Sequence, residues 1–117
     1  MMVKIRNGHT HALARRTTRQ LQHRHLVLAI SDRPLVLRSG EHVHQLRTLT
    51  TYDRRHAHAI NGLSGIDVDI PGTNMHFHRV NAPTTIDRAH RHRLIARSRR
   101  APDIAPAVVR AALRKLR

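Results

Sequence analysis

The chain has 117 residues, enough for one domain with a single modest hydrophobic core. It has no cysteine, which excludes disulfide bonds and thiolate metal sites, and its longest apolar run, Leu26 to Ile30, is far too short to span a bilayer. The net charge of +15 comes almost wholly from arginine and favours polyanionic partners, while Tyr52 and Phe77 are the only Phe, Tyr or Trp residues, so any core must be aliphatic.

The twelve histidines all lie in six His-x-His pairs, and these pairs organise the chain. The pairs are His9/His11, His23/His25, His42/His44, His56/His58, His76/His78 and His90/His92. The step between successive pairs alternates between 14 residues and 19 or 20 residues. This alternation predicts a tandem repeat of 33–34 residues, with copies over residues 9–41, 42–75 and 76–104.

Each half-repeat follows the pattern H-x-H-x-Φ-x-x-x-[T/S], in which Φ is an aliphatic residue. The Φ residues are Leu13, Val27, Leu46, Ile60, Val80 and Leu94, and the hydroxyl residues are Thr17, Ser31, Thr50, Ser64, Thr84 and Ser98. The two histidines and Φ are two residues apart, which is the spacing of side chains on one face of a β-strand. The pattern therefore predicts strands joined as hairpins.

In the first repeat, a turn centred between Arg19 and Gln22 is expected to join the two halves. Such a turn pairs His23 with the neighbourhood of Thr18 rather than with His9, so the two histidine pairs of one hairpin do not meet. Equivalent positions of different repeats become neighbours instead. We therefore expect the first-half pairs to meet one another, and the second-half pairs likewise.

Further turn signals follow along the chain. Ser39-Gly40 reads as a tight turn, and residues 71–74 (PGTN) separate a strand over 66–70 from a strand over 75–80. The segment 91–100, RHRLIARSRR, suits a helix by composition, but the repeat register predicts a strand. Three such units can close with pseudo-threefold symmetry or stack as a short solenoid, and the sequence does not choose between them.

The last part of the chain, residues 105–117, breaks the repeat and is expected to form a helical cap. Pro106 suits the first turn of a helix. One helix face carries Val109, Ala112, Leu113 and Leu116. We predict a short basic helix from about residue 106 to 116. The expected fold is a single, mostly β domain over residues 1–117, with three hairpin-type repeats and a short C-terminal α-helix.

These motifs resemble those of the YmaF family of small bacterial proteins, whose members have tandem His-x-His units, Thr-rich hairpins and a proline-containing connector. The matching segments are HVHQLRTLTTYDRRHAHAINGLSGIDVDIPG and HFHRVNAPTTIDRAHRHRL, and the resemblance extends over about residues 8 to 105. It implies an architecture but no established activity. Family members place a glycine before each pair and an aromatic residue at Φ. This chain has such a glycine only at Gly8, so turns and core are expected to pack differently.

The paired histidines are candidate metal ligands. Neutral imidazole binds Zn(II), Ni(II) and Cu(II), and two imidazoles on one strand face, about 7 Å apart, need partners from a neighbouring strand. The candidate ligands are His9, His11, His23, His25, His42, His44, His56, His58, His76, His78, His90 and His92. Six converging histidines would make a three-histidine or an octahedral site. The nearby carboxylates are Asp53, Asp67, Asp69 and Asp87. Abundant arginine is expected to lower the histidine pKa values and keep the rings neutral.

Two alternatives involve no metal. The histidines can form a structural ladder on a half-exposed strand face, hydrogen-bonded to the recurring Thr and Ser hydroxyls. The basic residues can form a non-specific surface for nucleic acid or another polyanion through counterion release. The residues of this candidate surface are Arg91, Arg93, Arg97, Arg99, Arg100, Arg110, Arg114 and Lys115, with Arg117 after them. Without aromatic platforms or a reading motif, sequence-specific recognition is not expected.

Catalysis and organelle import have the weakest support. Ser, Thr, His and Asp recur with the repeat rather than marking one unique site, so we do not expect an enzyme. The first 31 residues carry six basic residues and no acidic residue, as transit peptides do. Residues 9–31 already belong to the first repeat, however, so we expect an unprocessed cytoplasmic protein.

Overall fold

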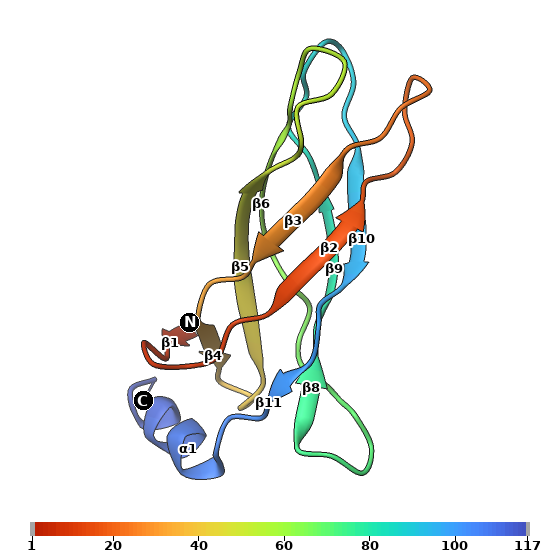
Figure 1. Ribbon diagram of the computed structural model, residues 1–117. Helices are drawn as coiled ribbons and strands as arrows, with labels where there is room; N and C mark the ends of the chain where they lie inside the picture. Colours follow the sequence, from red (N-terminus) through yellow and green to blue (C-terminus); the bar gives the residue numbers. More distant parts are fainter. Residues whose placement is uncertain (1, 117) are drawn as a thin grey trace.

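A computed structural model describes residues 2–116, which form a mostly β fold with one C-terminal helix, as the sequence predicts (Figure 1). Met1 and Arg117, the ends of the expected domain and cap, lie outside the described residues. The elements are β1 (Met2–Lys4), β2 (Ala12–Arg16), β3 (Leu26–Ile30), β4 (Pro34–Leu37), β5 (His42–Leu49), β6 (Ala59–Leu63), β7 (Val68–Asp69), β8 (Met75–Phe77), β9 (Arg79–Pro83), β10 (Arg93–Arg97), β11 (Ala101–Pro102) and α1 (Pro106–Arg114).

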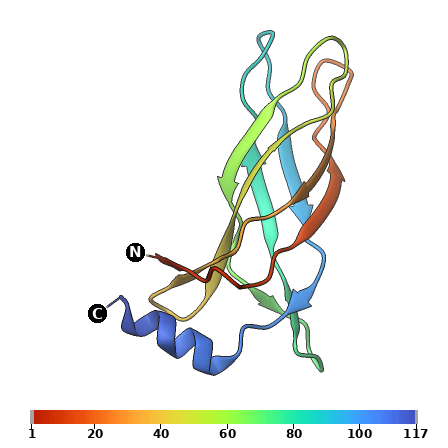
Figure 2. The same cartoon turned by 60° about the vertical axis from the view of Figure 1, so that its left-hand side comes forward.

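Three antiparallel hairpins, β2–β3, β5–β6 and β9–β10, form the body of the molecule. Their tips lie at the same end, away from α1 (Figures 1 and 2). Strand β3 packs beside β5, β6 beside β9, and β10 beside β2, so the third hairpin returns to contact the first. The segment 91–100 contains the strand β10, as its register predicts, and not a helix.

The second threonine of each Thr-Thr pair joins neighbouring hairpins. Thr18 N–H donates to the carbonyl of Arg93, and the Arg93 N–H donates back to the Thr18 hydroxyl, both at 2.9 Å. Thr51 is linked to Leu26, and Thr85 to Ala59, in the same reciprocal way. Each exchange satisfies backbone groups at a hairpin edge, which explains why the threonine recurs in register.

The core between the hairpins is aliphatic, as the composition predicts. It consists of the six Φ residues and Ala82, all of which are buried: Leu13, Val27, Leu46, Ile60, Val80, Ala82 and Leu94. Alternate residues of each hairpin strand point away from this core. Burial of one Φ side chain from each strand therefore fixes the register of the hairpins around the core.

Each hairpin tip is a two-residue turn in which both central residues have positive φ. The φ angles are 49° and 65° at Leu21 and Gln22, 51° and 66° at Arg54 and Arg55, and 51° and 64° at Arg88 and Ala89. This is a type I′ turn, which normally contains Asn or Gly. The first turn spans residues 20–23, about one residue later than predicted. No glycine or asparagine marks its position, and the predicted turn was therefore displaced by about one residue.

Smaller strands complete the end of the molecule opposite to the tips. The turn predicted at Ser39-Gly40 joins β4 to β5, with φ of 89° at Gly40. The PGTN turn joins β7 to β8, although β7 is shorter than predicted and residues 75–80 are divided between β8 and β9. Helix α1 starts at Pro106, as predicted, and contacts β4. Among the described residues, no helix has the length and apolarity needed to cross a membrane.

Candidate metal centres

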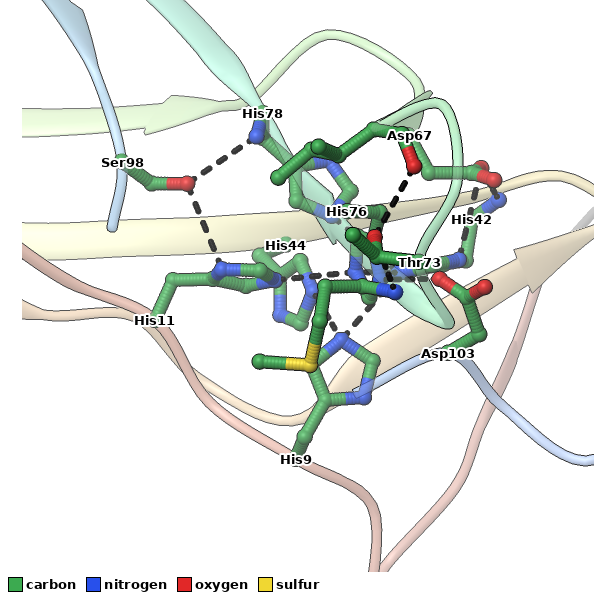
Figure 3. Close-up of polar contacts among 12 residues, drawn as sticks. His9, His11, His42, His44, Asp67, Thr73, His76, His78, Ser98 and Asp103 are labelled. Atoms are coloured by element: carbon green, nitrogen blue, oxygen red, sulfur yellow. Dashed lines mark hydrogen bonds and ion pairs between the residues drawn. The ribbon is translucent and has the colours of Figure 1, made fainter. Parts of the chain in front are cut away.

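The six first-half histidines converge near the beginnings of β2, β5 and β9, as the predicted hairpin geometry requires (Figure 3). We call this cluster the first centre; it consists of His9, His11, His42, His44, His76 and His78, and one nitrogen from each lies within 4.8 Å of all the others. Five of these residues are buried, and His9 is half-buried at the rim. The chain thus brings together residues that are up to 69 positions apart.

Adjacent ring nitrogens in the first centre are 3.0–3.2 Å apart. These Nε2–Nε2 separations join the pairs His11/His76, His42/His76, His42/His78, His9/His42 and His9/His44. Each ring stands edge-to-face with every other ring of the centre except one, with centroids 4.5–5.2 Å apart. The exceptions are His9/His78, His11/His42 and His44/His76. Three separate opposite pairs are the pattern of the vertices of an octahedron.

The six second-half histidines converge near the hairpin tips and form the second centre: His23, His25, His56, His58, His90 and His92. Their rings show the same pattern, with His23/His58, His25/His90 and His56/His92 opposite to each other. The nitrogens are less well gathered, because His58 is outside the set that lies within 4.8 Å. At about 3.3 Å per strand residue, some 20 Å separates the two centres.

The recurring hydroxyl residues fix the backbone at the second histidine of every pair. The histidine N–H donates to the hydroxyl oxygen at 2.9–3.0 Å in His11/Ser31, His25/Thr17, His44/Ser64, His58/Thr50, His78/Ser98 and His92/Thr84. All six histidines concerned are buried, as are the hydroxyl residues except Ser64, which is half-buried. The hydroxyl position of the repeat therefore holds the histidine backbone in place, and its three serines also lie 3.3–3.4 Å from Nδ1 of His44, His78 and His11.

The same six histidines have their ring orientation fixed by backbone carbonyls. Nδ1 lies 2.7–2.9 Å from the carbonyl oxygen in His11/Arg99, His25/Thr51, His44/Asp32, His58/Thr85, His78/Gly65 and His92/Thr18. A carbonyl only accepts hydrogen bonds, so Nδ1 carries the proton of the neutral ring. The other nitrogen, Nε2, is then an unprotonated lone pair directed into the centre.

The first histidines of the pairs are held by other acceptors. In the first centre, Nδ1 of His42 lies 3.3 Å from Asp67 and Nδ1 of His76 lies 3.0 Å from Asp103. In the second centre, the Nδ1 acceptors are the carbonyls of turn residues, in His23/Leu21, His56/Arg54 and His90/Arg88, at 3.1–3.3 Å. Nδ1 of His9 has no hydrogen-bond or ion-pair partner among residues 2–116.

Burial keeps several of the rings neutral. Burial first, and then repulsion from neighbouring histidines, lowers the pKa of His9 and His42 to about 2 and that of His44 to about 3. Burial also lowers the pKa of His78 and His92 to about 4. The sequence interpretation attributed this lowering to arginine, which is wrong: desolvation is its largest cause, because these rings lie inside the cluster.

The carboxylates that face the histidines are only partly those expected. Asp67 accepts from His42, and Asp53 lies 3.6 Å from Nδ1 of His25. In the described structure the side chains of Asp69 and Asp87 make no hydrogen bond to an imidazole. Asp103 was not foreseen, and no sequence pattern marks it; it reaches His76 because β11 pairs with β8.

The pairs differ from the predicted strand geometry. Only His42 and His44 both lie within a strand, while most pairs occupy the residues just before one. There the backbone N–H bonds to a hydroxyl instead of a strand partner. The two rings of a pair are 4.8–5.2 Å apart between centroids rather than about 7 Å. This closer approach allows both rings to enter the same centre.

The basic residues of the alternative polyanion surface are exposed but spread along the molecule. Arg91 lies beside the second centre, Arg93 and Arg97 are on β10, and Arg110 is on α1 at the opposite end (Figure 1). The others are Arg99, Arg100, Arg114 and Lys115. Arg97 stacks on Phe77 at 4.7 Å. These side chains therefore do not gather into one patch.

The fold and the two clusters define a mostly β, histidine-rich protein whose histidines lie in groups able to hold metal ions. The family model of YmaF, described as spore germination protein GerY/YamF, matches residues 6–99. The chain therefore belongs to the YmaF family, as its motifs predicted. No curated protein and no solved structure matches the chain.

Proposed function

We propose that this protein binds divalent transition metal ions at two centres, each built from three His-x-His pairs. The observation that carries the proposal is that Nε2 lone pairs converge to 3.0–3.2 Å in the first centre while their Nδ1 atoms face acceptors. Two unprotonated lone pairs at this distance repel each other, whereas a cation between them is attracted to both. The candidate ions are Zn(II), Ni(II) and Cu(II).

We infer that the hairpins are equivalent repeats in a closed, pseudo-threefold arrangement rather than a solenoid. The reciprocal bonds of Thr18, Thr51 and Thr85 support this, because each links its hairpin to the preceding one in cyclic order. The contact of β10 with β2 closes the cycle. In such an arrangement each centre receives one pair from every repeat.

A structural ladder of histidines has less support. A ladder on an open strand face would leave the rings solvated and splayed, but nine of the twelve histidines are buried and the other three pack edge-to-face against buried rings. All six recurring hydroxyls accept from backbone N–H groups, and only the three serines also lie within 3.3–3.4 Å of a ring nitrogen. Nothing in this packing requires twelve unprotonated nitrogens to point inward, whereas metal binding does.

We expect the first centre to bind more tightly than the second. In the first centre, the carboxylates of Asp67 and Asp103 lie beside Nδ1 of His42 and His76. A carboxylate in this position orients the imidazole ring and raises its basicity. The second centre is bordered by the turn residues Arg54, Arg55 and Arg88, whose charges oppose a cation. Its nitrogens also converge less closely.

Binding of polyanions remains the second candidate function, supported by the +15 charge and the exposure of all eight predicted basic residues. It predicts retention of nucleic acid at low salt and a steep loss of affinity as salt is added. Absence of nucleic-acid retention at low salt would contradict this second function.

We propose no catalytic role, since no unique constellation of residues stands apart from the repeated ones. The family's description associates the protein with spore germination.

The test is calorimetric titration of Zn(II), Ni(II) and Cu(II) into protein purified without a histidine tag. We expect dissociation constants tighter than about micromolar, weakening on acidification because protons compete for Nε2. A scrambled histidine-rich peptide of the same composition is the control. Binding no tighter than that of the peptide would overturn the proposal.

A further inference from the structure

We propose that the first centre is a coordinatively saturated, octahedral six-nitrogen site that prefers Ni(II) to Zn(II) and leaves no position on the ion for water or substrate. This inference rests on the proposed function, because it concerns the ion that those histidines bind. It goes further by fixing the coordination number and the class of ion.

The ring arrangement carries the first step. In the first centre, each ring has one ring opposite to it and lies edge-to-face with the rest, and the opposite rings are His9/His78, His11/His42 and His44/His76. Every opposite pair combines two different His-x-His pairs. A tetrahedral site has no opposite ligands and a square-planar site has two opposite pairs, so three opposite pairs belong to octahedral six-coordination.

The distances agree with an ion at the middle. In an octahedron, adjacent ligand atoms are separated by the metal–ligand distance multiplied by the square root of two. The observed Nε2–Nε2 separations of 3.0–3.2 Å therefore correspond to a metal–nitrogen distance of about 2.2 Å, which is slightly longer than that of tetrahedral zinc. The nitrogens joined by these five separations are already spaced as adjacent ligands of such an ion.

The anchoring of the rings opposes a lower coordination number. A four-coordinate ion would leave two imidazole lone pairs buried without a partner. Rings such as His11, His44 and His78 cannot turn away without breaking their Nδ1 bonds to Arg99, Asp32 and Gly65. His9 is different, because it lies at the rim and its Nδ1 has no partner among the described residues. It is the one ligand that can leave.

Six imidazole nitrogens, five of them on anchored rings, determine the class of ion. Affinities of nitrogen sites rise toward Ni(II) and Cu(II), but Cu(II) favours tetragonal geometry and Zn(II) favours tetrahedral geometry. An undistorted six-nitrogen site therefore offsets the usual advantage of copper and suits Ni(II), followed by Co(II) and Fe(II). We expect Ni(II) to bind at least about tenfold more tightly than Zn(II).

The experiment uses the full-length chain carrying His25→Ala and His58→Ala, which removes the second centre. Its Co(II) complex is examined by absorption spectroscopy, and its Mn(II) complex by water-proton relaxation. We expect the weak d–d bands of six-coordinate Co(II) and no inner-sphere water on Mn(II). Adding His9→Ala should open one position, so that water relaxation rises while the metal stays bound. Competition between Ni(II) and Zn(II) measures the preference.

The outcomes separate the two claims. Intense tetrahedral Co(II) bands, an inner-sphere water in the parent variant, or Zn(II) binding as tightly as Ni(II) would overturn the octahedral site while leaving metal binding intact. Failure of every ion to bind wild-type protein would overturn both. If the His9→Ala variant does not fold, the Co(II) spectrum and the competition in the parent variant still decide.

Discussion

At the scale of single residues, the two histidines of each pair are held in place by different contacts. The second histidine is fixed twice, by a hydroxyl at its N–H and by a carbonyl at Nδ1, whereas the first depends on its local surroundings. In the first centre those surroundings are carboxylates, as at His76, and in the second they are turn carbonyls, as at His56. The chemistry of each ring therefore depends on the acceptor that lies beside its Nδ1 atom.

Replacing Asp103 by Ala should weaken metal binding at the first centre by about 10- to 100-fold, because His76 loses the carboxylate that orients it. Calorimetric titration measures the change. Asp69→Ala is the matched control, since the Asp69 side chain makes no bond to an imidazole. Equal affinities for the two variants would contradict the assigned role of Asp103.

Replacing Thr50 by Val should destabilise the fold by about 1–3 kcal/mol, since the buried N–H of His58 loses its acceptor while the side-chain volume is kept. Urea unfolding of the metal-free protein measures this. Thr48→Val, two residues earlier in the chain, removes a hydroxyl that bonds only to the neighbouring Leu49 carbonyl, and should have little effect. A loss as large in the control would refute the explanation.

At the scale of elements, the sequence predicted the strands of the hairpins better than their tips. The alternation of side chains with a period of two residues and the recurring Thr-Thr pairs predicted the strands. Hairpin geometry then required His9 to meet His42 and His76 rather than His23. The tips were harder, because Arg54 and Arg55 adopt positive φ without the usual Asn or Gly. Asp103 was beyond prediction, since its position depends on the long-range pairing of β11 with β8.

The strained tips give an element-scale prediction. Replacing Arg54-Arg55 by Asn-Gly should stabilise the metal-free protein by about 1 kcal/mol or more, because these residues adopt positive φ with less strain. Denaturant unfolding measures the difference, with Lys-Lys as the control that keeps the charge. A destabilised Asn-Gly variant would show that the turn is not strained.

At the scale of the whole molecule, the metal-free protein should lose stability on acidification. Burial holds the pKa of His42 at about 2 and that of His44 at about 3, whereas the unfolded value is about 6.5. The unfolded chain therefore binds more protons below about pH 6.5, so the contribution is fully present above that pH and falls as the pH drops.

At about pH 5 the loss should be roughly 2 kcal/mol for each of these two histidines. Urea unfolding between about pH 8 and pH 5 measures it. The double variant His42→Gln/His44→Gln should show a shallower dependence on pH. A stability that is constant or rises on acidification would contradict the burial of neutral rings.

At the scale of the whole molecule, a chain of net charge +15 also brings its histidine nitrogens together in two clusters. A cation at each centre would bind all three hairpins together, at points about 20 Å apart. Metal binding should therefore stabilise the fold as a whole, by an amount that grows with the logarithm of the metal concentration divided by the dissociation constant.

Native mass spectrometry of tag-free protein titrated with Ni(II) tests the central claim most directly. The wild-type chain should hold two ions. The variant His42→Ala/His44→Ala should hold one ion, at the second centre, and His25→Ala/His58→Ala should hold one ion, at the first. Absence of bound ions in the wild type, or the same number in all three proteins, would contradict the convergence of the histidines as the basis of metal binding.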